Sequence, residues 1–202
     1  MDKNKLHLQG LKYQLSSHFL FNVLNTVRAL TRKDTEKATN MITLASEYLR
    51  YALHKLDHFE TTLGEEKTGI GLFLQLQAYR FHDTIMMTWN IPENILLAKI
   101  PSFLLQPLVE LVYKRADKDE NGRQQIALDA LLKNENLVLS VSCPRCLPDK
   151  EPSGAFVPKS DVEEGVEQVH ILLQELYGNK GILEIIETGN AKKIQLQIPY
   201  ET

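Results

Sequence analysis

Two amphipathic stripes within the first sixty residues constrain the fold more than any other feature of this chain. Apolar residues recur at helical spacing from Leu11 to Leu30, and again from Met41 to Leu56. This recurrence predicts two amphipathic helices, and the polar residues 31–36 predict a short connection between them. An isolated antiparallel hairpin cannot bury both stripes, so we expect two copies of the chain to pair into a four-helix bundle. The sequence therefore predicts a homodimer.

The remainder of the chain mixes helical and strand patterns. Thr62 and Glu65 have the spacing of a capping box, which predicts a helix running to about Phe81. A second helix is expected to open at Pro101, because proline favours the first turn of a helix, and a third to span 162–177. Strands are expected at 85–91, 126–131, 137–141, 182–186 and 193–198, with a hairpin turn at 134–136 and a long irregular loop at 143–161. The predicted fold class is α+β: an N-terminal helical hairpin, then an α/β sandwich with helices on one face of a mixed, mostly antiparallel sheet.

The boundary between the two parts is expected near residue 60, which gives a hairpin over 1–58 and a sandwich over 62–202. The formal net charge of −3 provides no electrostatic footprint for nucleic acid. No apolar run approaches the roughly 20 residues needed to span a bilayer, and the first residues lead into no signal-peptide core. We therefore expect a soluble, cytoplasmic protein without a nucleic-acid partner.

Four side chains have the spacing of metal or redox ligands but lack the rest of such a site. Cys143 and Cys146 stand in one Cys-Pro-Arg-Cys motif, surrounded by prolines and not at the start of a predicted helix. Two thiols alone cannot complete a structural zinc site, so we interpret the pair as two loop thiols. His54 and His58 are four residues apart on a predicted helix, but no carboxylate or cysteine is evidently placed beside them. We interpret them as solvated helix surface, and no metal site is expected.

Four sequence motifs occur in a fixed order along the chain. The first, Leu-Lys-Tyr-Gln-Leu-Ser-Ser-His-Phe-Leu-Phe-Asn at 11–22, contains His18, and the second is Leu-Arg-Tyr at 49–51. Gln-Ala-Tyr-Arg-Phe follows at 77–81, and Ile-Pro-Ser-Phe-Leu-Leu-Gln-Pro-Leu-Val-Glu at 100–110. Over nearly the whole chain these motifs resemble those of LytS/YehU-type sensor histidine kinases. The resemblance implies a two-component signalling protein with a dimerisation and histidine-phosphotransfer hairpin and an ATPase-like domain.

His18 takes the place of the phospho-acceptor in this resemblance. An imidazole nitrogen would attack a phosphoryl group, and an aspartate in the receiver domain of a response regulator would accept it from the phosphohistidine. Asn22, one helical turn further on, would orient the ring or the phosphoryl group. The implied partners are a second copy of the chain and a receiver domain. Family members usually carry an N-terminal membrane or sensor region, so contact with a membrane is expected only through such a region, of which this chain would be the cytosolic part.

The ATP-binding motifs of the family are degenerate here. After the residue matching Glu110 the family places an asparagine that coordinates magnesium, whereas this chain has Leu111, which offers no oxygen ligand, and retains Lys114. Cys143 and its neighbours replace the Asp-x-Gly motif that binds adenine. The Gly-x-Gly-Leu motif that wraps the phosphates keeps one glycine, Gly165. We therefore expect no ATP or magnesium cofactor.

Three functions remain open from the sequence. The first is a histidine phosphotransferase or regulatory pseudokinase that works with a response regulator and does not bind ATP in the usual way. The second is a divergent but active sensor histidine kinase that autophosphorylates on His18, with Glu110 as the retained candidate on the magnesium side. The third is a structural dimerisation or interaction module. Replacement of His18 separates the first from the third, and nucleotide binding separates the second from both.

Overall fold

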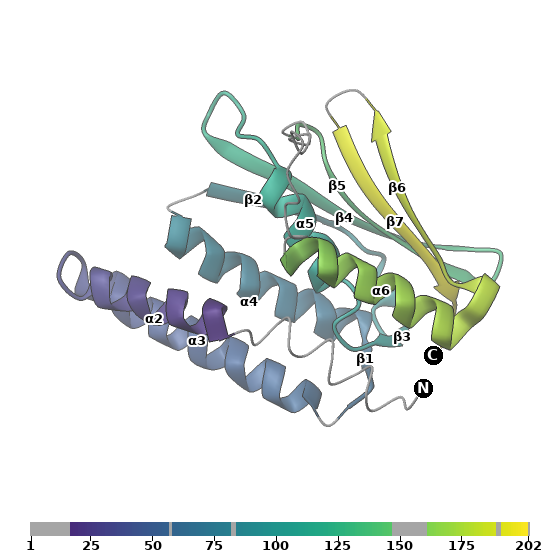
Figure 1. Ribbon diagram of the computed structural model, residues 1–202, viewed down its shortest axis with the longest axis horizontal. Helices are drawn as coiled ribbons and strands as arrows, with labels where there is room; N and C mark the ends of the chain where they lie inside the picture. Colours follow the sequence, from purple (N-terminus) through teal and green to yellow (C-terminus); the bar gives the residue numbers. More distant parts are fainter. Residues whose placement is uncertain (1–16, 57, 82–83, 147–160, 189–190, 202) are drawn as a thin grey trace, which may run out of the picture.

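The computed structural model describes residues 17–56, 58–81, 84–146, 161–188 and 191–201, and the statements below concern these residues. They form a helical hairpin, a further long helix and a sheet with two helices on one face, so the predicted α+β class is confirmed (Figure 1). The beginning of the histidine motif, 11–16, and most of the predicted irregular loop at 143–161 lie outside the described residues. In the described part of the chain, no helix has both the length and the apolar character needed to cross a bilayer.

The predicted hairpin consists of α2 (Ser17–Leu30) and α3 (Thr35–Leu56). Asp34 caps α3, because its Oδ1 accepts the backbone N–H of Lys37 at 3.0 Å. The buried stripe contains Phe19, Val23 and Leu30 from α2 and Ala38, Met41, Tyr48 and Ala52 from α3. On the opposite side of α2, Phe21 and Leu24 are 65% and 64% exposed. The hairpin therefore presents an apolar face that neither of its own helices covers.

A reciprocal capping box begins α4 (Leu63–Phe81), as the sequence predicts. The Glu65 backbone N–H donates to Thr62 Oγ1, and the Thr62 backbone N–H donates to Glu65 Oε2, both at 3.2 Å. The helix lies against α3, and the two approach closely where the ring of Tyr51 covers Gly69. A Cβ atom added to Gly69 would overlap that ring. The absence of a side chain at Gly69 thus permits the spacing between the hairpin and α4.

Glu65 also pairs with a buried lysine at the end of α3. Nζ of Lys55 lies 2.7 Å from Glu65 Oε2 and 2.5 Å from Thr61 Oγ1, although the lysine side chain is only 3% exposed. The hydrogen bonds from Lys55 and then from Thr61 lower the pKa of Glu65 to about 2. The same carboxylate therefore caps α4 and neutralises a cation that the hairpin buries.

Replacement of Glu65 with glutamine is expected to lower stability in a pH-dependent way. A carboxylate whose pKa falls on folding stabilises the folded state above its unfolded pKa, near 4.5, and loses that contribution as the pH falls toward 2. Because the Glu65 side chain is 52% exposed, solvent screening leaves an expected loss of about 1 kcal/mol at neutral pH. Urea unfolding of both proteins over an acidic pH series should show their difference in unfolding free energy shrinking below the unfolded pKa. A difference that does not change with pH would contradict this origin.

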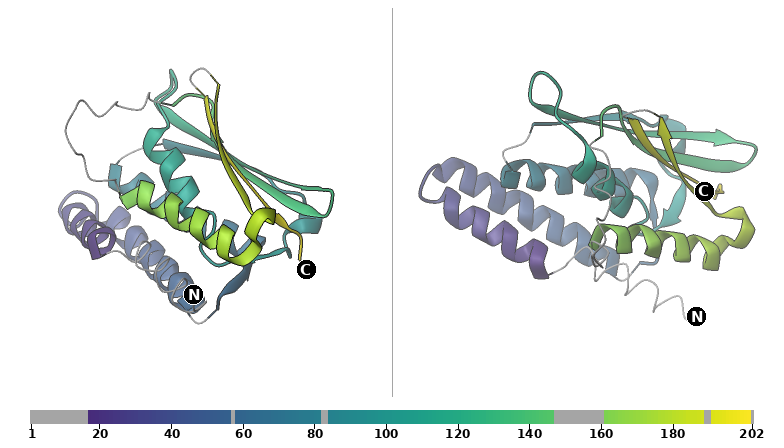
Figure 2. Two further views of the ribbon diagram at one scale, coloured as in Figure 1. Left: turned by 45° about the vertical axis from the view of Figure 1, so that its right-hand side comes forward. Right: turned by 45° about the horizontal axis from the view of Figure 1, so that its top comes forward.

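The sheet has five strands in the order β2-β4-β5-β7-β6. Its strands are β2 (Thr84–Asn90), β4 (Arg123–Lys133), β5 (Asn136–Cys143), β6 (Ile182–Thr188) and β7 (Ala191–Pro199). β2 pairs parallel with β4 and the other neighbours are antiparallel, which confirms the predicted mixed sheet. α5 (Gln106–Arg115) and α6 (Asp161–Tyr177), the latter followed by the short η2 (Gly178–Lys180), lie on one face (Figure 2). Asn134 and Glu135 form the predicted turn between β4 and β5, with the positive φ values of 48° and 61° that such a two-residue turn requires.

The helix that was expected to open at Pro101 begins at Gln106 instead, so that prediction is wrong. Pro101 ends a short strand, β3 (Lys99–Pro101), which follows η1 (Glu93–Ile95) and pairs antiparallel with β1 (Glu60–Thr62). The chain must turn sharply between β3 and α5, and Phe103 makes this turn with a φ of 66°, which no helical residue adopts. Pro107 lies in the first turn of α5, the position that the sequence analysis predicted for Pro101.

The hairpin and the sandwich share one hydrophobic core. The rings of Phe19 in α2, Tyr48 in α3 and Phe73 in α4 meet with centroids 5.4, 6.0 and 6.4 Å apart. The same cluster of buried side chains continues through α5 to the sheet, where it includes Leu139 and Leu196. The hairpin is therefore held in contact with the rest of the chain, and the division into 1–58 and 62–202 stays a prediction.

Candidate functional site

His18 lies in the first turn of α2 with its ring exposed to solvent. Its Nε2 lies 3.1 Å from Nδ2 of Asn22, one turn further along. An amide nitrogen donates, so Nε2 accepts, and this assignment places the ring proton on Nδ1. Thr26 Oγ1 in turn donates to the Asn22 carbonyl at 2.9 Å. The structure thus brings together the two residues that the sequence names as the histidine site, and their chemical role stays a prediction.

The rotation of α2 that exposes His18 is fixed by the next residue. Phe19 is 8% exposed and packs its ring against Tyr48 and Phe73. Successive side chains on a helix point about 100° apart, so burial of Phe19 directs its neighbour away from the core. The apolar part of the histidine motif therefore serves to present the imidazole.

Glu110, the retained candidate on the magnesium side, interacts with Lys114, the other residue retained from this motif. Oε1 of Glu110 lies 3.2 Å from Nζ of Lys114, one turn further along α5. Leu111, at the position of the family's asparagine, is 5% exposed and belongs to the hydrophobic core. An aliphatic side chain offers no oxygen to a hard cation. At this position α5 supplies packing instead of a metal ligand.

Gly165, the remaining glycine of the phosphate motif, lies where α6 meets α5. It is buried, and a Cβ atom added to it would come within 3.3 Å of Cβ of Pro107. In a phosphate-binding motif the backbone around such a glycine is free to face the phosphates. Here the glycine allows two helices to pack against each other.

Cys143 ends β5 and is 1% exposed. The structure joins it to Cys146 by a disulfide, so the interpretation of the pair as two separate loop thiols is wrong. The physical reason is that the chain after β5 folds back: Ala116 and Cys146 form an antiparallel bridge, and the Asp117 N–H donates to the Arg145 carbonyl at 2.9 Å. A turn closed by the disulfide therefore occupies the position of the adenine motif, and backbone hydrogen bonds connect it to the residues that follow α5.

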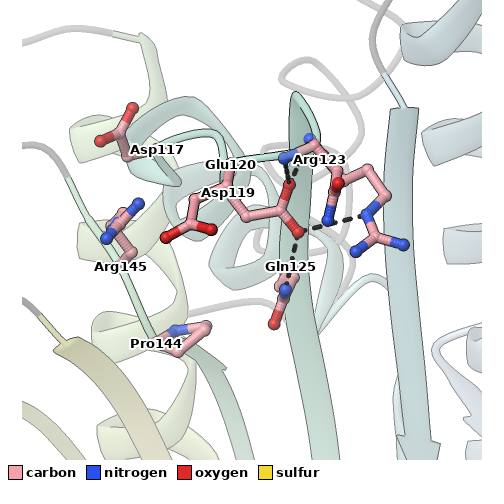
Figure 3. Close-up of a pocket in the computed structure, with 8 residues that line it drawn as sticks. Asp117, Asp119, Glu120, Arg123, Gln125, Pro144 and Arg145 are labelled. Carbon is pink, nitrogen blue, oxygen red and sulfur yellow. Dashed lines mark hydrogen bonds and ion pairs between the residues drawn. The ribbon is translucent and has the colours of Figure 1, made fainter.

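A polar pocket of about 390 Å³ lies beside this turn (Figure 3). Asp119 is hydrogen-bonded to its own loop and to the start of β4. It accepts the backbone N–H groups of Asn121 and Arg123 at 2.8 and 2.9 Å and the Gln125 side-chain amide at 3.0 Å. These bonds, that of Arg123 foremost, lower the pKa of Asp119 to about 2. The acidic stretch 117–120 thus belongs to a turn organised by one carboxylate.

A buried carboxylate of α4 that was not identified from the sequence, that of Glu66, binds the backbone before α5. Glu66 is 1% exposed, and its Oε1 accepts the Leu105 N–H at 3.0 Å. Its Oε2 accepts the Phe103 N–H and the Tyr51 hydroxyl, each at 3.2 Å. Burial raises the pKa of Glu66, and these hydrogen bonds act against the rise. The carboxylate satisfies backbone donors that the turn into α5 would otherwise bury without partners.

The sequence contains a signal for this network. Leu63, Glu66, Ile70 and Phe73 follow one helical stripe, which places Glu66 on the buried face of α4. Beside it, Gln106 Nε2 donates to the buried Tyr48 hydroxyl at 2.8 Å. The network therefore joins α3, α4 and the first residue of α5 through buried polar groups.

The rings of His54 and His58 lie near the end of α3 with their centroids 4.9 Å apart and their planes tilted by 37°, and both residues are exposed. Among the residues that the structure describes, no group of three or more His, Cys, Asp and Glu side chains is gathered as a metal site. α3 ends at Leu56, so His58 lies beyond the helix and the prediction that both histidines stand on one helix is wrong.

Comparisons with known sequences identify relatives of this chain. The family model described as Histidine kinase matches residues 6–85. Sensor histidine kinase BtsS of Escherichia coli K12 is 28% identical over 192 residues, which cover 94% of this chain and 33% of BtsS. Sensor protein LytS of Staphylococcus haemolyticus is 31% identical over 200 residues, which cover 96% of this chain and 34% of LytS. This chain thus spans about a third of the length of the curated relatives it matches.

Two solved structures share the fold over nearly their whole length. A bacterial phosphotransferase aligns with a TM-score of 0.58 at 11% identity, covering 96% of this chain and 95% of the other. The histidine kinase AdeS of Acinetobacter baumannii aligns with a TM-score of 0.50 at 9% identity, covering 91% and 96%. The sequence relatives, the family match and the shared fold agree with the motifs around His18. The chain belongs to the histidine kinase family of two-component signalling proteins, together with LytS and BtsS.

Proposed function

We propose that this chain is a histidine phosphotransfer protein that accepts and returns a phosphoryl group at His18 and does not bind ATP in the usual way. The observation that carries the proposal is a contrast between two sites. At the histidine site the ring of His18 is exposed and its Nε2 lies 3.1 Å from Nδ2 of Asn22. The magnesium position of the nucleotide site holds Leu111, which is buried in the core.

The transfer needs only groups that the hairpin and a receiver domain provide. Nε2 of His18 attacks the phosphorus of a phosphoaspartate, a P–N bond forms, and the bond from phosphorus to the aspartate oxygen breaks. With the ring proton on Nδ1, the Nε2 lone pair becomes available when the Asn22 amide turns away from it. The same amide can then donate to a phosphoryl oxygen from one helical turn away. The receiver domain regains a free carboxylate, and no nucleotide is consumed.

The residues at the nucleotide motifs do not fit magnesium-ATP. Leu111 gives no oxygen to the cation, and Glu110 is paired with Lys114. Cys143 stands where a carboxylate would accept the adenine amino group, and its sulfur is engaged in the disulfide. Gly165 packs against α5. These features support a nucleotide domain that acts in regulation or scaffolding.

Calorimetric titration with magnesium-ATP tests this part of the proposal. We expect no heat of binding up to millimolar nucleotide, because the metal and adenine ligands are missing. The titrated protein should nevertheless accept labelled phosphate from a phosphorylated receiver domain. Tight, magnesium-dependent binding would contradict the proposal and favour the divergent kinase that autophosphorylates on His18.

A homodimer is also part of the proposed function. Phe21, Leu24, Ile42 and Leu53 of the hairpin are each more than half exposed, at 65%, 64%, 51% and 54%. A second hairpin could cover these side chains and complete a four-helix bundle. His18 lies on the same helix as two of them, so the bundle would carry one histidine site on each chain.

Replacement of Phe21 with aspartate is therefore expected to weaken dimerisation by at least about tenfold, because it places a charge in the buried seam of the bundle. Sedimentation analysis over a concentration series measures the effect. Leu97→Asp is the matched control: Leu97 is 74% exposed and lies outside the hairpin, so its replacement should leave the dimer unchanged. A monomeric wild type, or equal effects of the two variants, would contradict the hairpin interface.

A further inference from the structure

We propose that Cys143 and Cys146 are a reversible redox site, which a low-molecular-weight disulfide of the glutathione type oxidises to the intramolecular disulfide seen in the structure. The two residues are the only cysteines of the 202-residue sequence, so each has one possible partner within the chain. The site uses neither His18 nor Asn22. It therefore does not depend on the proposed phosphotransfer.

Separate structural elements hold the two residues at the distance that a disulfide needs. Their Cα atoms lie 6.2 Å apart, within the range of about 4.4 to 6.8 Å found in disulfides. Cys143 is fixed by the pairing of β5 with β7. Cys146 is held by its bridge to Ala116 and by the adjacent hydrogen bond from the Asp117 N–H to the Arg145 carbonyl. The thiols can therefore meet without rearrangement of the sheet.

The two sulfurs differ in access, which gives each one a role. Cys143 is 1% exposed, whereas Cys146 is partly exposed and follows Arg145. An accessible thiol next to a cation is the one expected to react first with an external disulfide. Cys143 then resolves the mixed disulfide from inside the fold.

Cys143 has a cationic neighbour on the adjacent strand. Lys192 is the direct cross-strand partner of Cys143 on β7 and is largely buried. A pocket of about 430 Å³ is lined by Cys143, Lys192 and Lys193 together with Ile126 and Ile186. A nearby ammonium group favours the thiolate form of Cys143, which resolves the mixed disulfide.

The reaction is balanced by one disulfide molecule. The Cys146 thiolate attacks one sulfur of glutathione disulfide, the S–S bond of the reactant breaks, and a first glutathione thiolate leaves. Cys143 gives its proton to that thiolate and attacks the sulfur of Cys146, which expels the second glutathione. The two cysteines lose two electrons in total, and glutathione disulfide gains them.

Thiol counting on the full chain tests the proposal. After reduction, maleimide labelling and mass spectrometry should find two reactive thiols, and after treatment with glutathione disulfide none, with the chains not cross-linked to one another. Cys143→Ser should trap one glutathione on Cys146, at least about tenfold faster than Cys146→Ser traps it on Cys143. Two thiols that persist through oxidation, or disulfides only between chains, would overturn the proposal. A reversed rate order would overturn the assigned roles.

Hydrogen exchange gives a readout that does not require a variant. The Asp117 amide donates to Arg145, inside the segment that the disulfide closes, whereas the Ala116 amide donates to the helical Val112 carbonyl at 2.8 Å. Reduction should accelerate exchange at Asp117 by at least about threefold and leave Ala116 unchanged. Equal protection of Asp117 in both redox states would show that the disulfide does not hold the turn against α5.

Discussion

Replacement of His18 with alanine is expected to reduce phosphoryl transfer from a phosphorylated receiver domain by at least about 10³-fold, because it removes the attacking nitrogen. The ring is exposed and its neighbour Phe19 supplies the packing, so the variant should fold and dimerise as the wild type does. Transfer of labelled phosphate from the receiver domain to the chain measures the effect. Labelling of the variant at the wild-type rate would show that another residue is the acceptor.

Two further variants give this experiment its controls. His170 is also an exposed histidine on a helix, so His170→Ala should transfer phosphate normally. Asn22→Ala should slow transfer by about tenfold, because Asn22 orients the ring without forming the new bond. An intact dimer that takes no phosphate in any form would favour a regulatory or structural role for the chain.

Replacement of Gly69 with alanine is expected to destabilise the protein by about 2 kcal/mol, the largest effect on stability that we expect from adding one methyl group. The new Cβ would overlap the Tyr51 ring, and overpacking of this kind costs about 1–3 kcal/mol or more. The gain in helix propensity, about 1 kcal/mol, offsets part of that cost. Thermal unfolding should show a fall in Tm of about 6 °C for a chain of this size.

Gly71, two residues along the same helix, provides the matched control. No atom lies within 4 Å of the Cβ that alanine would place there, so Gly71→Ala should stabilise the protein by up to about 1 kcal/mol. In a Tyr51→Leu background the cost of Gly69→Ala should shrink, because the ring that it meets is gone. Equal effects of the two glycine replacements would contradict the close approach of α3 and α4.

Local patterns in the sequence predicted the elements that depend on local interactions. The stripes of α2 and α3 predicted the hairpin, and the spacing of Thr62 and Glu65 predicted the capping box that both side chains complete. The adjacency of His18 and Asn22 followed from helical geometry alone. The strands of the sheet were found because alternation and turn residues marked them.

Features that depend on contacts distant in sequence were not predicted. The start of α5 is displaced by a turn at Phe103, whose N–H is held by Glu66, a residue 37 positions earlier. The pairing of Cys143 with Cys146 depends on the bridge between Cys146 and Ala116, which only the folded chain brings together. The contact of Gly165 with α5 is equally tertiary in origin. Propensity and periodicity do not contain such information.

The buried carboxylate of Glu66 couples the position of the hairpin to that of α5. Its oxygens bind the Tyr51 hydroxyl from the hairpin and the backbone at the start of α5, while Gln106 binds Tyr48 beside it. A shift of α3 relative to α5 would leave a buried carboxylate and buried amides without partners, and each such group costs about 1–3 kcal/mol. Any signal that rotates or slides α2 and α3 must therefore either move α5 with them or first break these hydrogen bonds.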